Sequence, residues 1–206
     1  MDVTAFANLS PTTFADVLTR DRVMDHGIRS VWGPPPRVAG PAFPVRCGKG
    51  DNLMLQAAIH LAPAGSVIVV EAGDCEYAVS GGNVCAWAQQ RGIVAFVVDG
   101  VVRDVAEVRE RGFPVFARGV LPIAGGRNKS GVLNGPAMCG GVRVIPGDIV
   151  VADEEGIVVI EHDRAEEVLR AAEAKAARDA ALTLEDWASA HAERIGQTLQ
   201  ELGYTE

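Results

Sequence analysis

The sequence has few aromatic residues, no long apolar run and no excess of positive charge, and each absence narrows what the protein can be. Aromatic residues make up 5% and hydrophobic residues 48% of its 206 residues, which is typical of a globular domain. No basic segment precedes a long apolar stretch, so neither a signal peptide nor a membrane span is predicted, and we expect a cytoplasmic protein. The formal charge of -8 argues against nucleic acid as a partner.

Cysteine and histidine are too sparse and too widely spaced for several kinds of site. The four cysteines never form a Cys-x-x-Cys pair, which argues against a zinc knuckle or a dithiol redox centre and favours reduced, buried thiols. No two histidines are paired at i+2 or i+4, so a histidine-ligated zinc is not expected either. The Gly-x-Ser-x-Gly motif of serine hydrolases is also missing.

The middle of the chain alternates helical spacing with wholly apolar strands. The expected helices are 52–61, 82–91 and 103–111, and the expected strands are 66–71, 93–98 and 114–117. Such alternation predicts an α/β fold with a parallel sheet covered by helices, whose ligands bind beyond the carboxyl ends of the strands. Residues 38–46 read as a further strand, but their prolines predict an edge or a bulge.

The two ends of the chain show other patterns. A helix is expected over 12–25 with Ser10 or Thr12 as its N-cap. Short strands at 142–145, 149–152 and 157–161, separated by tight turns, predict an antiparallel meander. We therefore assign residues 1–162 to one domain and 163–206 to a C-terminal helical extension.

The extension contains two amphipathic helices and has twice as many acidic as basic residues. Its second helix carries an apolar stripe consisting of Leu184, Trp187, His191, Ile195, Leu199 and Leu202. We expect the extension to serve assembly. Trp187 in this stripe and Trp87 in the central part are interpreted as core or interface residues.

Two features have no assigned role at this stage. The segment Gly125–Gly131 is the only basic, glycine-rich stretch, but it lacks the Gly-Lys-Ser/Thr ending of a phosphate loop. We interpret it as a mobile surface loop, in which a Schiff-base role for Lys129 is not expected. Asp51 and Asn52 follow a glycine at a predicted helix start, and their roles stay open.

The segment with the most chemical character runs from residue 81 to residue 107. Gly81 and Gly82 precede a predicted helix, whose free amides at Asn83 and Val84 would bind a small carboxylate. Four charged residues then gather near the end of the strand at 93–98, namely Asp99, Arg103, Asp104 and Glu107. Carboxylates beside an arginine can bind a hard cation together with an anionic substrate. A helix-capping role for Asp104 and Glu107 and a simple turn at Asp99 are the alternatives.

The segments 97–104 and 112–119, Val-Val-Asp-Gly-Val-Val-Arg-Asp and Gly-Phe-Pro-Val-Phe-Ala-Arg-Gly, closely resemble the RraA-like family. That family includes regulators of ribonuclease E activity, class II 4-hydroxy-4-methyl-2-oxoglutarate aldolases and oxaloacetate decarboxylases. Segments 40–42, 50–52, 146–148 and 151–156 extend the resemblance over most of the chain. It implies a three-layer β/β/α swivelling fold, with a parallel sheet and an antiparallel meander, that forms a homotrimer or hexamer with active sites at subunit interfaces.

The resemblance also implies roles for individual residues. Arg103 would bind the substrate's keto oxygen, Asp104 would hold Mg²⁺ or Mn²⁺ largely through waters, and Glu107 would complete the outer shell of the metal. Gly81, Gly82 and the amides near Asn83 and Val84 would receive the pyruvyl carboxylate, in agreement with the anion site inferred above; these two glycines and the two residues after them are the predicted substrate-binding set.

One position departs from the family's true aldolases, which carry an aspartate where this chain has Gly82. Retro-aldol cleavage requires a base, whereas decarboxylation requires only an electron sink. The departure favours oxaloacetate decarboxylation, although a metal-bound hydroxide could still serve an aldolase of 4-hydroxy-4-methyl-2-oxoglutarate or 4-carboxy-4-hydroxy-2-oxoadipate. The sequence thus predicts a divalent-metal-dependent carbon-carbon lyase that acts on small 2-oxo acids through a pyruvate enolate. The alternative is a non-catalytic regulator of ribonuclease activity that acts by protein binding.

Overall fold

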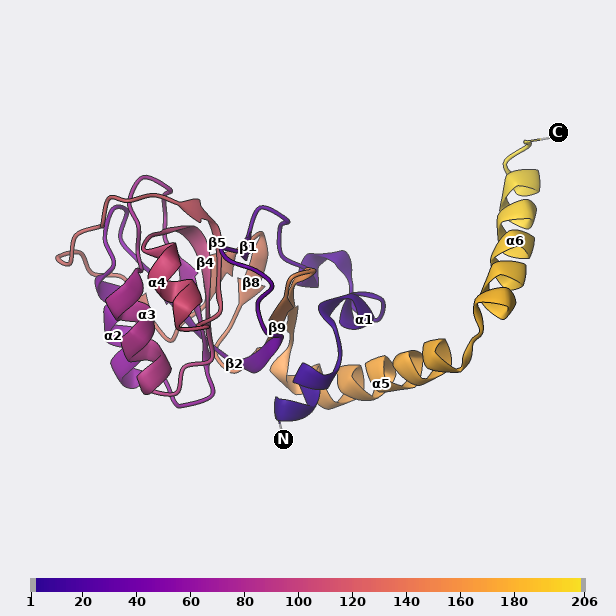
Figure 1. The fold of residues 1–206 in the computed structure, drawn as a ribbon, viewed down its shortest axis with the longest axis horizontal. Coiled ribbons are helices and arrows are strands. Elements are labelled where there is room, and N and C mark those ends of the chain that lie inside the picture. The colour runs from indigo at the N-terminus through magenta and orange to yellow at the C-terminus, as the bar shows by residue number, and fades with distance from the viewer. Residues whose placement is uncertain (1–2, 205–206) are drawn as a thin grey trace. The chain divides into compact units, whose positions relative to one another are not determined.

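The computed structural model describes residues 3–204, which fall into one unit ending at Ala172 and a second beginning at Glu173. The first unit is built on an eight-stranded sheet in the order β1-β5-β4-β3-β2-β9-β10, with β6 beside β2 (Figure 1). Its strands are β1 (Arg29–Ser30), β2 (Val38–Arg46), β3 (Val67–Glu71), β4 (Ala95–Val102), β5 (Val115–Val120), β6 (Val132–Leu133), β9 (Ile149–Asp153) and β10 (Gly156–Ile160).

Strands β2 to β5 are parallel, and three helices connect them. These are α2 (Leu53–Leu61), α3 (Gly82–Gln90) and α4 (Val105–Glu110), which Figure 1 shows grouped on one side of the sheet. The predicted alternation of helices and parallel strands is confirmed. It arises because strands buried on both faces read as continuous apolar runs, as the burial of every residue from Val67 to Val70 illustrates.

The sheet is covered on both faces, which gives the three-layer β/β/α arrangement that the family resemblance implies. Ile68, Val70, Phe96 and Val98 pack toward the helices. Their neighbours in the same strands pack in the opposite direction, against the paired strands β7 (Ala137–Cys139) and β8 (Val142–Val144) and against β9 and β10. The alternation of side chains along a strand therefore divides the core into two halves.

The proline-containing strand β2 lies inside the sheet, so the edge prediction for residues 38–46 is wrong. β2 pairs with β9 along Val38–Pro41 and with β3 from Ala42 onward. The Ala42 amide donates to the Asp148 carbonyl on the β9 side of the strand, at 2.7 Å. Backbone nitrogens two residues apart in a strand face the same side, so the nitrogen of Pro44 also faces the β9 side. The pairing of β2 with β9 has already ended there, at Pro41. A strand that changes partners can therefore hold a proline without losing a ladder hydrogen bond.

The N-terminal segment is less helical than predicted. Helix α1 covers only Pro11–Ala15, although Ser10 caps it as expected by accepting the Thr13 amide at 3.2 Å. Phe14 is buried and stacks on Phe6, with ring centroids 5.8 Å apart. After α1 the chain turns, because Val23 forms a β-bridge with Val158 of β10. A helix that continued to residue 25 could not make this bridge, so α1 ends early.

The predicted antiparallel meander is correct only for its last two strands. β9 and β10 form a hairpin, whereas β8 pairs with β7 rather than with β9. Between β8 and β9, Gly147 has a φ of +89°, and the buried Asp148 accepts the Ile145 amide at 3.0 Å. This turn redirects the chain out of the two-stranded sheet.

Helix α5 (Ala165–Ala181) begins within the first unit, where Ala165, Val168 and Ala172 are buried in a cluster with Phe6 and Phe14. Residues 163–172, which the sequence analysis placed in the extension, thus belong to the first unit in the structure. No helix within residues 3–204 combines the length and the apolar character needed to cross a bilayer.

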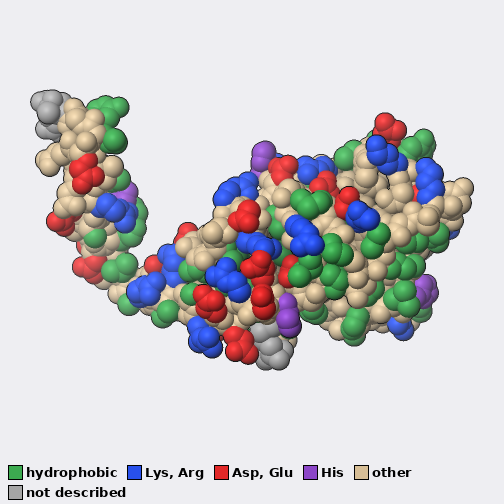
Figure 2. Space-filling view, turned by 180° about the vertical axis from the view of Figure 1, so that it is seen from behind, with side chains coloured by type: hydrophobic (Ala, Val, Ile, Leu, Met, Phe, Trp, Pro, Cys, Tyr) green, Lys and Arg blue, Asp and Glu red, His purple; other side chains and the backbone are tan. Residues whose placement is uncertain are grey.

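The second unit contains the rest of α5 and helix α6 (Leu184–Glu201), which Thr183 caps by accepting the Asp186 amide at 3.1 Å. α6 has no buried residue. Figure 2 shows hydrophobic side chains along one side of it and acidic ones along the other. Trp187 is 49% exposed and stacks on His191, and Trp87 on α3 is also exposed. Neither tryptophan is a core residue, and the role of the extension in assembly stays a prediction.

Phe96 provides a test of the helix-facing half of the core, because it is fully buried and meets Phe113 edge to face at 5.0 Å. We expect Phe96→Ala to lower the free energy of unfolding by about 3–5 kcal/mol. Leu61→Ala, at a 62% exposed position on α2, is the control and should change it by less than about 0.5 kcal/mol. Urea unfolding followed by circular dichroism measures both. Equal losses in the two variants would contradict this packing.

Candidate active site

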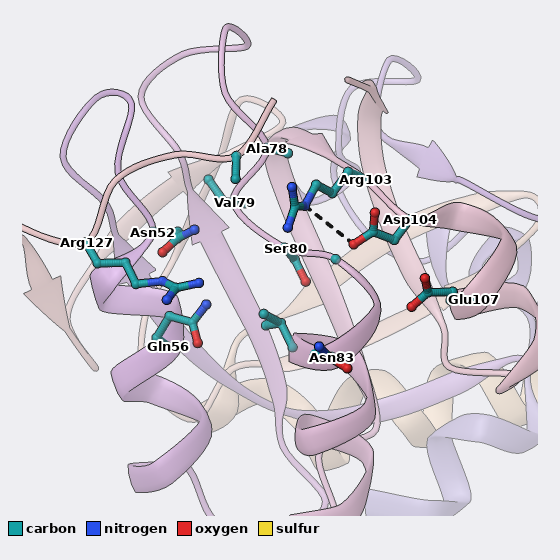
Figure 3. A pocket seen from close by; sticks show the side chains of 13 residues that line it. Asn52, Gln56, Ala78, Val79, Ser80, Asn83, Arg103, Asp104, Glu107 and Arg127 are labelled. Carbon is teal, nitrogen blue, oxygen red and sulfur yellow. Dashed lines mark ion pairs between the residues drawn. The ribbon is translucent and has the colours of Figure 1, made fainter. Parts of the chain in front are cut away.

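A pocket of about 180 Å³ lies where helix α3 begins and strand β4 ends (Figure 3). Its size suits a small molecule. The polar residues that line it come from α2, from the start of α3, from the turn after β4 and from the glycine-rich loop; they are Asn52, Gln56, Ser80, Asn83, Arg103, Asp104, Glu107 and Arg127. The predicted residues from 81 to 84 and from 103 to 107 are thus brought together.

The start of α3 presents free backbone amides to this pocket. The Gly82 amide donates to Asp104 Oδ2 at 3.0 Å. The next two amides, of Asn83 and Val84, make no hydrogen bond within the described part of the chain. Both residues line the pocket. Unpaired amides at a helix start attract an anion, so the groups on which the predicted carboxylate site depends are in place, and binding of a carboxylate there stays a prediction.

Asp104 has a backbone conformation that few residues other than glycine adopt, with φ 59° and ψ 37°. It precedes α4, yet its side chain makes no capping hydrogen bond, so the alternative of a simple helix cap does not hold. Its carboxylate lies 3.4 Å from Arg103 Nε instead. Strained backbone that orients a carboxylate toward a pocket is characteristic of functional sites.

Two carboxylates lie against the start of α3, at glycines 81 and 82. A Cβ on Gly81 would collide with Asp104 Oδ2, and one on Gly82 would collide with Glu107 Oε2. The Glu107 carboxylate has no hydrogen-bond or ion-pair partner among residues 3–204. The space that an aspartate side chain would need at position 82 is therefore occupied by a carboxylate that comes from α4.

The carboxylates of Asp104 and Glu107 suit a hard cation that keeps part of its water shell. Among residues 3–204 there is no cluster of three or more His, Cys, Asp or Glu side chains that could hold a metal ion. Mg²⁺ often binds through one or two carboxylates and completes its shell with water and substrate oxygens. Two exposed carboxylates beside a helix start with free amides match that requirement, whereas they would not suit a site built only from protein ligands.

The interpretation of Asp99 as a member of this cluster is wrong. Asp99 lies within β4, which extends to Val102, and its side chain bonds to Arg118 and accepts the Gly140 amide at 2.8 Å. Successive side chains of a strand point to opposite faces, and Asp99 faces the side of β7. Its proximity to Arg103 in the sequence did not reveal this.

The glycine-rich loop lies at the surface, as predicted, and hydrogen bonds tie it to the start of α2. Gly126 exchanges backbone hydrogen bonds with Gly50 and Asn52, at 2.8 and 2.9 Å. The buried Asp51 accepts the amides of Asn128 at 2.7 Å and Lys129 at 3.1 Å. These bonds hold the intervening residue, Arg127, at the pocket.

Asp51 also accepts the Leu53 amide at 2.8 Å and thereby supports the first turn of α2. Burial raises the pKa of this carboxyl group, but the three backbone amides together outweigh burial, and the pKa lies below its ordinary value. The role that the sequence left open for Asp51 is therefore to hold the loop. Sequence reasoning missed Arg127 and Gln56 as pocket residues; the basic, glycine-rich composition of the loop was the only available signal.

Two alternative nucleophiles are not supported by the geometry. Cys85 is 1% exposed and packs against Ser80, and burial raises the pKa of its thiol to about 11. The thiol is thus protonated at neutral pH, as expected for a core residue. The ammonium group of Lys129 donates to the Lys49 carbonyl and does not line this pocket; that it forms no Schiff base stays a prediction.

The lowered pKa of Asp51 predicts a pH-dependent contribution to stability. Because the group is more acidic in the folded state, its stabilisation is complete above its ordinary pKa and is lost as the pH falls through the folded-state value. We expect wild type to be more stable than Asp51→Asn at pH 7, and the difference to shrink below about pH 4. Chemical unfolding at several pH values measures it. A difference that does not depend on pH would contradict this role.

A family model, a curated relative and solved structures all connect this chain to the RraA-like proteins. A family model described as RraA-like, Aldolase/RraA, matches residues 7–159. A protein of Halalkalibacterium halodurans named "Putative 4-hydroxy-4-methyl-2-oxoglutarate aldolase" is 42% identical over 146 residues, which are 70% of this chain and 70% of that protein.

Solved structures show the same fold. Streptomyces coelicolor RraAS2, described as an unusual member of the RNase ES inhibitor RraA protein family, superposes with a TM-score of 0.76 at 28% identity, covering 86% of this chain and 92% of that one. The RNA-processing inhibitor RraA from Thermus thermophilis has a TM-score of 0.65 at 29% identity, covering 72% and 90%. Because the family model matches residues 7–159 and the solved structures share the fold, the chain belongs to the RraA-like family.

Proposed function

We propose that the protein is a divalent-metal-dependent carbon-carbon lyase for small 2-oxo acids. The observation that carries the proposal is the convergence of Arg103, Asp104 and Glu107 on the free amides of α3 around one small pocket. Such an arrangement offers an anion site, a fixed positive charge and carboxylates for a hard cation within the space of one small substrate. The names of the aldolase relatives support this reaction class.

The proposed binding mode places the substrate's C1 carboxylate on the amides of Asn83 and Val84. The Arg103 guanidinium then lies beside the C2 keto oxygen, where negative charge develops as the bond between C3 and C4 breaks. A fixed positive charge stabilises the resulting pyruvate enolate more than it stabilises the neutral ketone, and this difference accelerates the reaction.

Asp104 and Glu107 would hold the cation. When bound, Mg²⁺ or Mn²⁺ supplies additional positive charge close to the developing enolate. Asp104 is fixed for this task by the Gly82 amide and by Arg103 Nε. These contacts orient its carboxylate before substrate arrives.

The two candidate reactions differ in what they require of Glu107. In aldol cleavage the C4 hydroxyl loses a proton, the electrons of the C3–C4 bond move to the C2 oxygen, and a second carbonyl compound leaves. Glu107, whose carboxylate has no partner in the described chain and lies next to position 82, where the aldolases carry their aspartate, would accept that proton through a water molecule. Decarboxylation of oxaloacetate needs no such transfer and stays within the proposal.

The second candidate function is regulation of a ribonuclease by protein binding, which the solved RraA structures favour. Fold likeness alone does not choose between catalysis and binding, because the family fold hosts both. The composition of the pocket favours catalysis, since a protein that acts only through its surface has no need of two carboxylates and an arginine at a helix start.

Turnover tests the proposal. We expect pyruvate to form from 4-hydroxy-4-methyl-2-oxoglutarate, from oxaloacetate or from both in the presence of Mg²⁺, and to stop on addition of EDTA; coupling to lactate dehydrogenase measures it. Arg103→Ala should lower kcat/KM by about 10²–10³-fold. Arg109→Ala, at an exposed position on α4 outside the pocket, should leave it unchanged. Absence of turnover on both substrates, or turnover that survives EDTA and the Arg103 substitution, would exclude the mechanism.

The position of Glu107 over Gly82 gives an independent test. A methyl group at residue 82 would displace the Glu107 carboxylate, so we expect Gly82→Ala to lower kcat by about 10²-fold with little change in folding. Gly196→Ala is the matched control, because an added Cβ there meets nothing within 4 Å. Full activity of Gly82→Ala would show that Glu107 is not needed where the structure has it.

A further inference from the structure

Helix α6 carries an apolar surface that the described part of the chain leaves uncovered. We call it the α6 stripe; it consists of Leu184, Trp187, His191, Ile195, Leu199 and Leu202. All of its members except the histidine are between 42% and 75% exposed, and no residue of the helix is buried. Figure 2 shows hydrophobic side chains gathered along one side of this helix. A continuous apolar surface of this kind marks a site of interaction with another molecule.

No charged residue interrupts the α6 stripe. Its first and last members are 18 residues apart, from 184 to 202, which is five full turns of an α-helix, so both lie on one line along the helix surface. Ala188 and Thr198 fill the spaces between the larger members. The same periodicity places Asp186 and Glu193 on the opposite side of the helix. The stripe is therefore straight and apolar over its whole length.

The spacing of the α6 stripe is the same in both directions along the helix. Counted from residue 193, its members lie two, six and nine residues away on either side, as the pairs His191 and Ile195, Trp187 and Leu199, and Leu184 and Leu202. An antiparallel copy of the helix would thus bring a member of one stripe to the level of a member of the other at every position. This is the self-complementarity of an interface with two-fold symmetry, in which each residue contacts its counterpart's partner and the reverse.

The charges at the ends of the helix favour the antiparallel direction. The amide end of an α-helix carries a partial positive charge and the carbonyl end a partial negative one. In an antiparallel pair the opposite charges lie side by side at both ends. In a parallel pair like charges would meet, and so would the acidic first turns, which contain Glu185 and Asp186.

The α6 stripe is large enough for a specific contact between two copies. Its side chains expose on the order of 500 Å² on each copy, so a pair would cover on the order of 1,000 Å² in total, the size at which specific interfaces begin. Trp187 stacks on His191 with ring centroids 4.6 Å apart. The largest side chain of the stripe is thus already held in place, and it loses little freedom when the contact forms.

From the symmetry, the end charges and the area, we infer that α6 pairs antiparallel with α6 of a second copy of this chain, so that the two stripes cover each other. Leu184 of one copy lies at the level of Leu202 of the other, and Trp187 at the level of Leu199. The inference does not depend on the proposed function, because no residue of α6 lines the candidate active site.

The mass of the full-length protein in solution tests whether the stripe pairs. Leu199→Glu places a charge within the stripe, whereas Gln200→Glu places the same charge on the opposite side of the helix and is the matched control. In analytical ultracentrifugation at one protein concentration, we expect Gln200→Glu to keep the mass of the wild-type assembly and Leu199→Glu to halve it. Circular dichroism verifies that both variants stay folded. An unchanged mass of Leu199→Glu would overturn the inference.

Cross-linking tests the direction of the pair. Leu184 and Leu202 are the two most exposed members of the stripe, so both can be replaced while the middle of the stripe stays intact. With the exposed Cys75 changed to serine, the full chain carrying Leu184→Cys and Leu202→Cys together should form a disulfide-linked dimer under mild oxidation, seen on a non-reducing gel. Neither single variant should do so, because its two cysteines lie at opposite ends of the pair, about 27 Å apart.

Each other outcome of the cross-linking experiment rejects the inferred pair. A linked dimer of either single variant would show a parallel arrangement. Absence of any linked dimer, in a protein whose mass Leu199→Glu halves, would show that the stripe binds a different surface of the second copy. The lyase proposal is tested by turnover alone, so it stands or falls separately from these results.

Discussion

The hydrogen bond from the Gly82 amide to Asp104 Oδ2, 3.0 Å long, joins the two loops from which the pocket is built. It connects the first turn of α3 to the turn that follows β4, and it requires both a left-handed backbone at Asp104 and the absence of a side chain at Gly81. Because Asp104 is fixed in this way, Arg103 and Glu107 also face the free amides of α3. Positive and negative groups then meet around one small volume, and neither sign dominates it.

The sequence predicted the parts of the site that depend on local order. A helix start after a strand and a charged turn after the next parallel strand must meet at one edge of a sheet, so residues 81–84 and 103–107 could be grouped in advance. Asp99 could not be separated from them, because nearness in sequence does not tell which face of β4 a side chain takes. Arg127 was out of reach for another reason: its place depends on hydrogen bonds between two segments far apart in the chain. The central position of β2 could not be predicted, because its prolines are typical of an edge strand. They fit inside the sheet only because β2 changes its pairing partner along its length.

Gly82 shows how a departure from a family pattern can conserve the chemistry of a site. Considered alone, the loss of an aspartate at this position argued against aldol cleavage. The structure shows a carboxylate from α4 next to this position, so the two positions are neighbours: a side chain at 82 would require the Glu107 carboxylate to move. Relatives with different residues at these two places can therefore present similar charge to a substrate. Residue-by-residue comparison would count them as different.

The tether between the glycine-rich loop and the start of α2 also has a consequence for binding thermodynamics. A loop that orders only around its ligand subtracts the lost conformational entropy from the affinity. Here the loop is held by hydrogen bonds of Asp51, Gly126 and Asn128 that the chain makes with itself, so the entropy of ordering the loop is lost during folding. Much of the interaction of Arg127 with an anion would then remain as net affinity, and association would not wait for the loop to close.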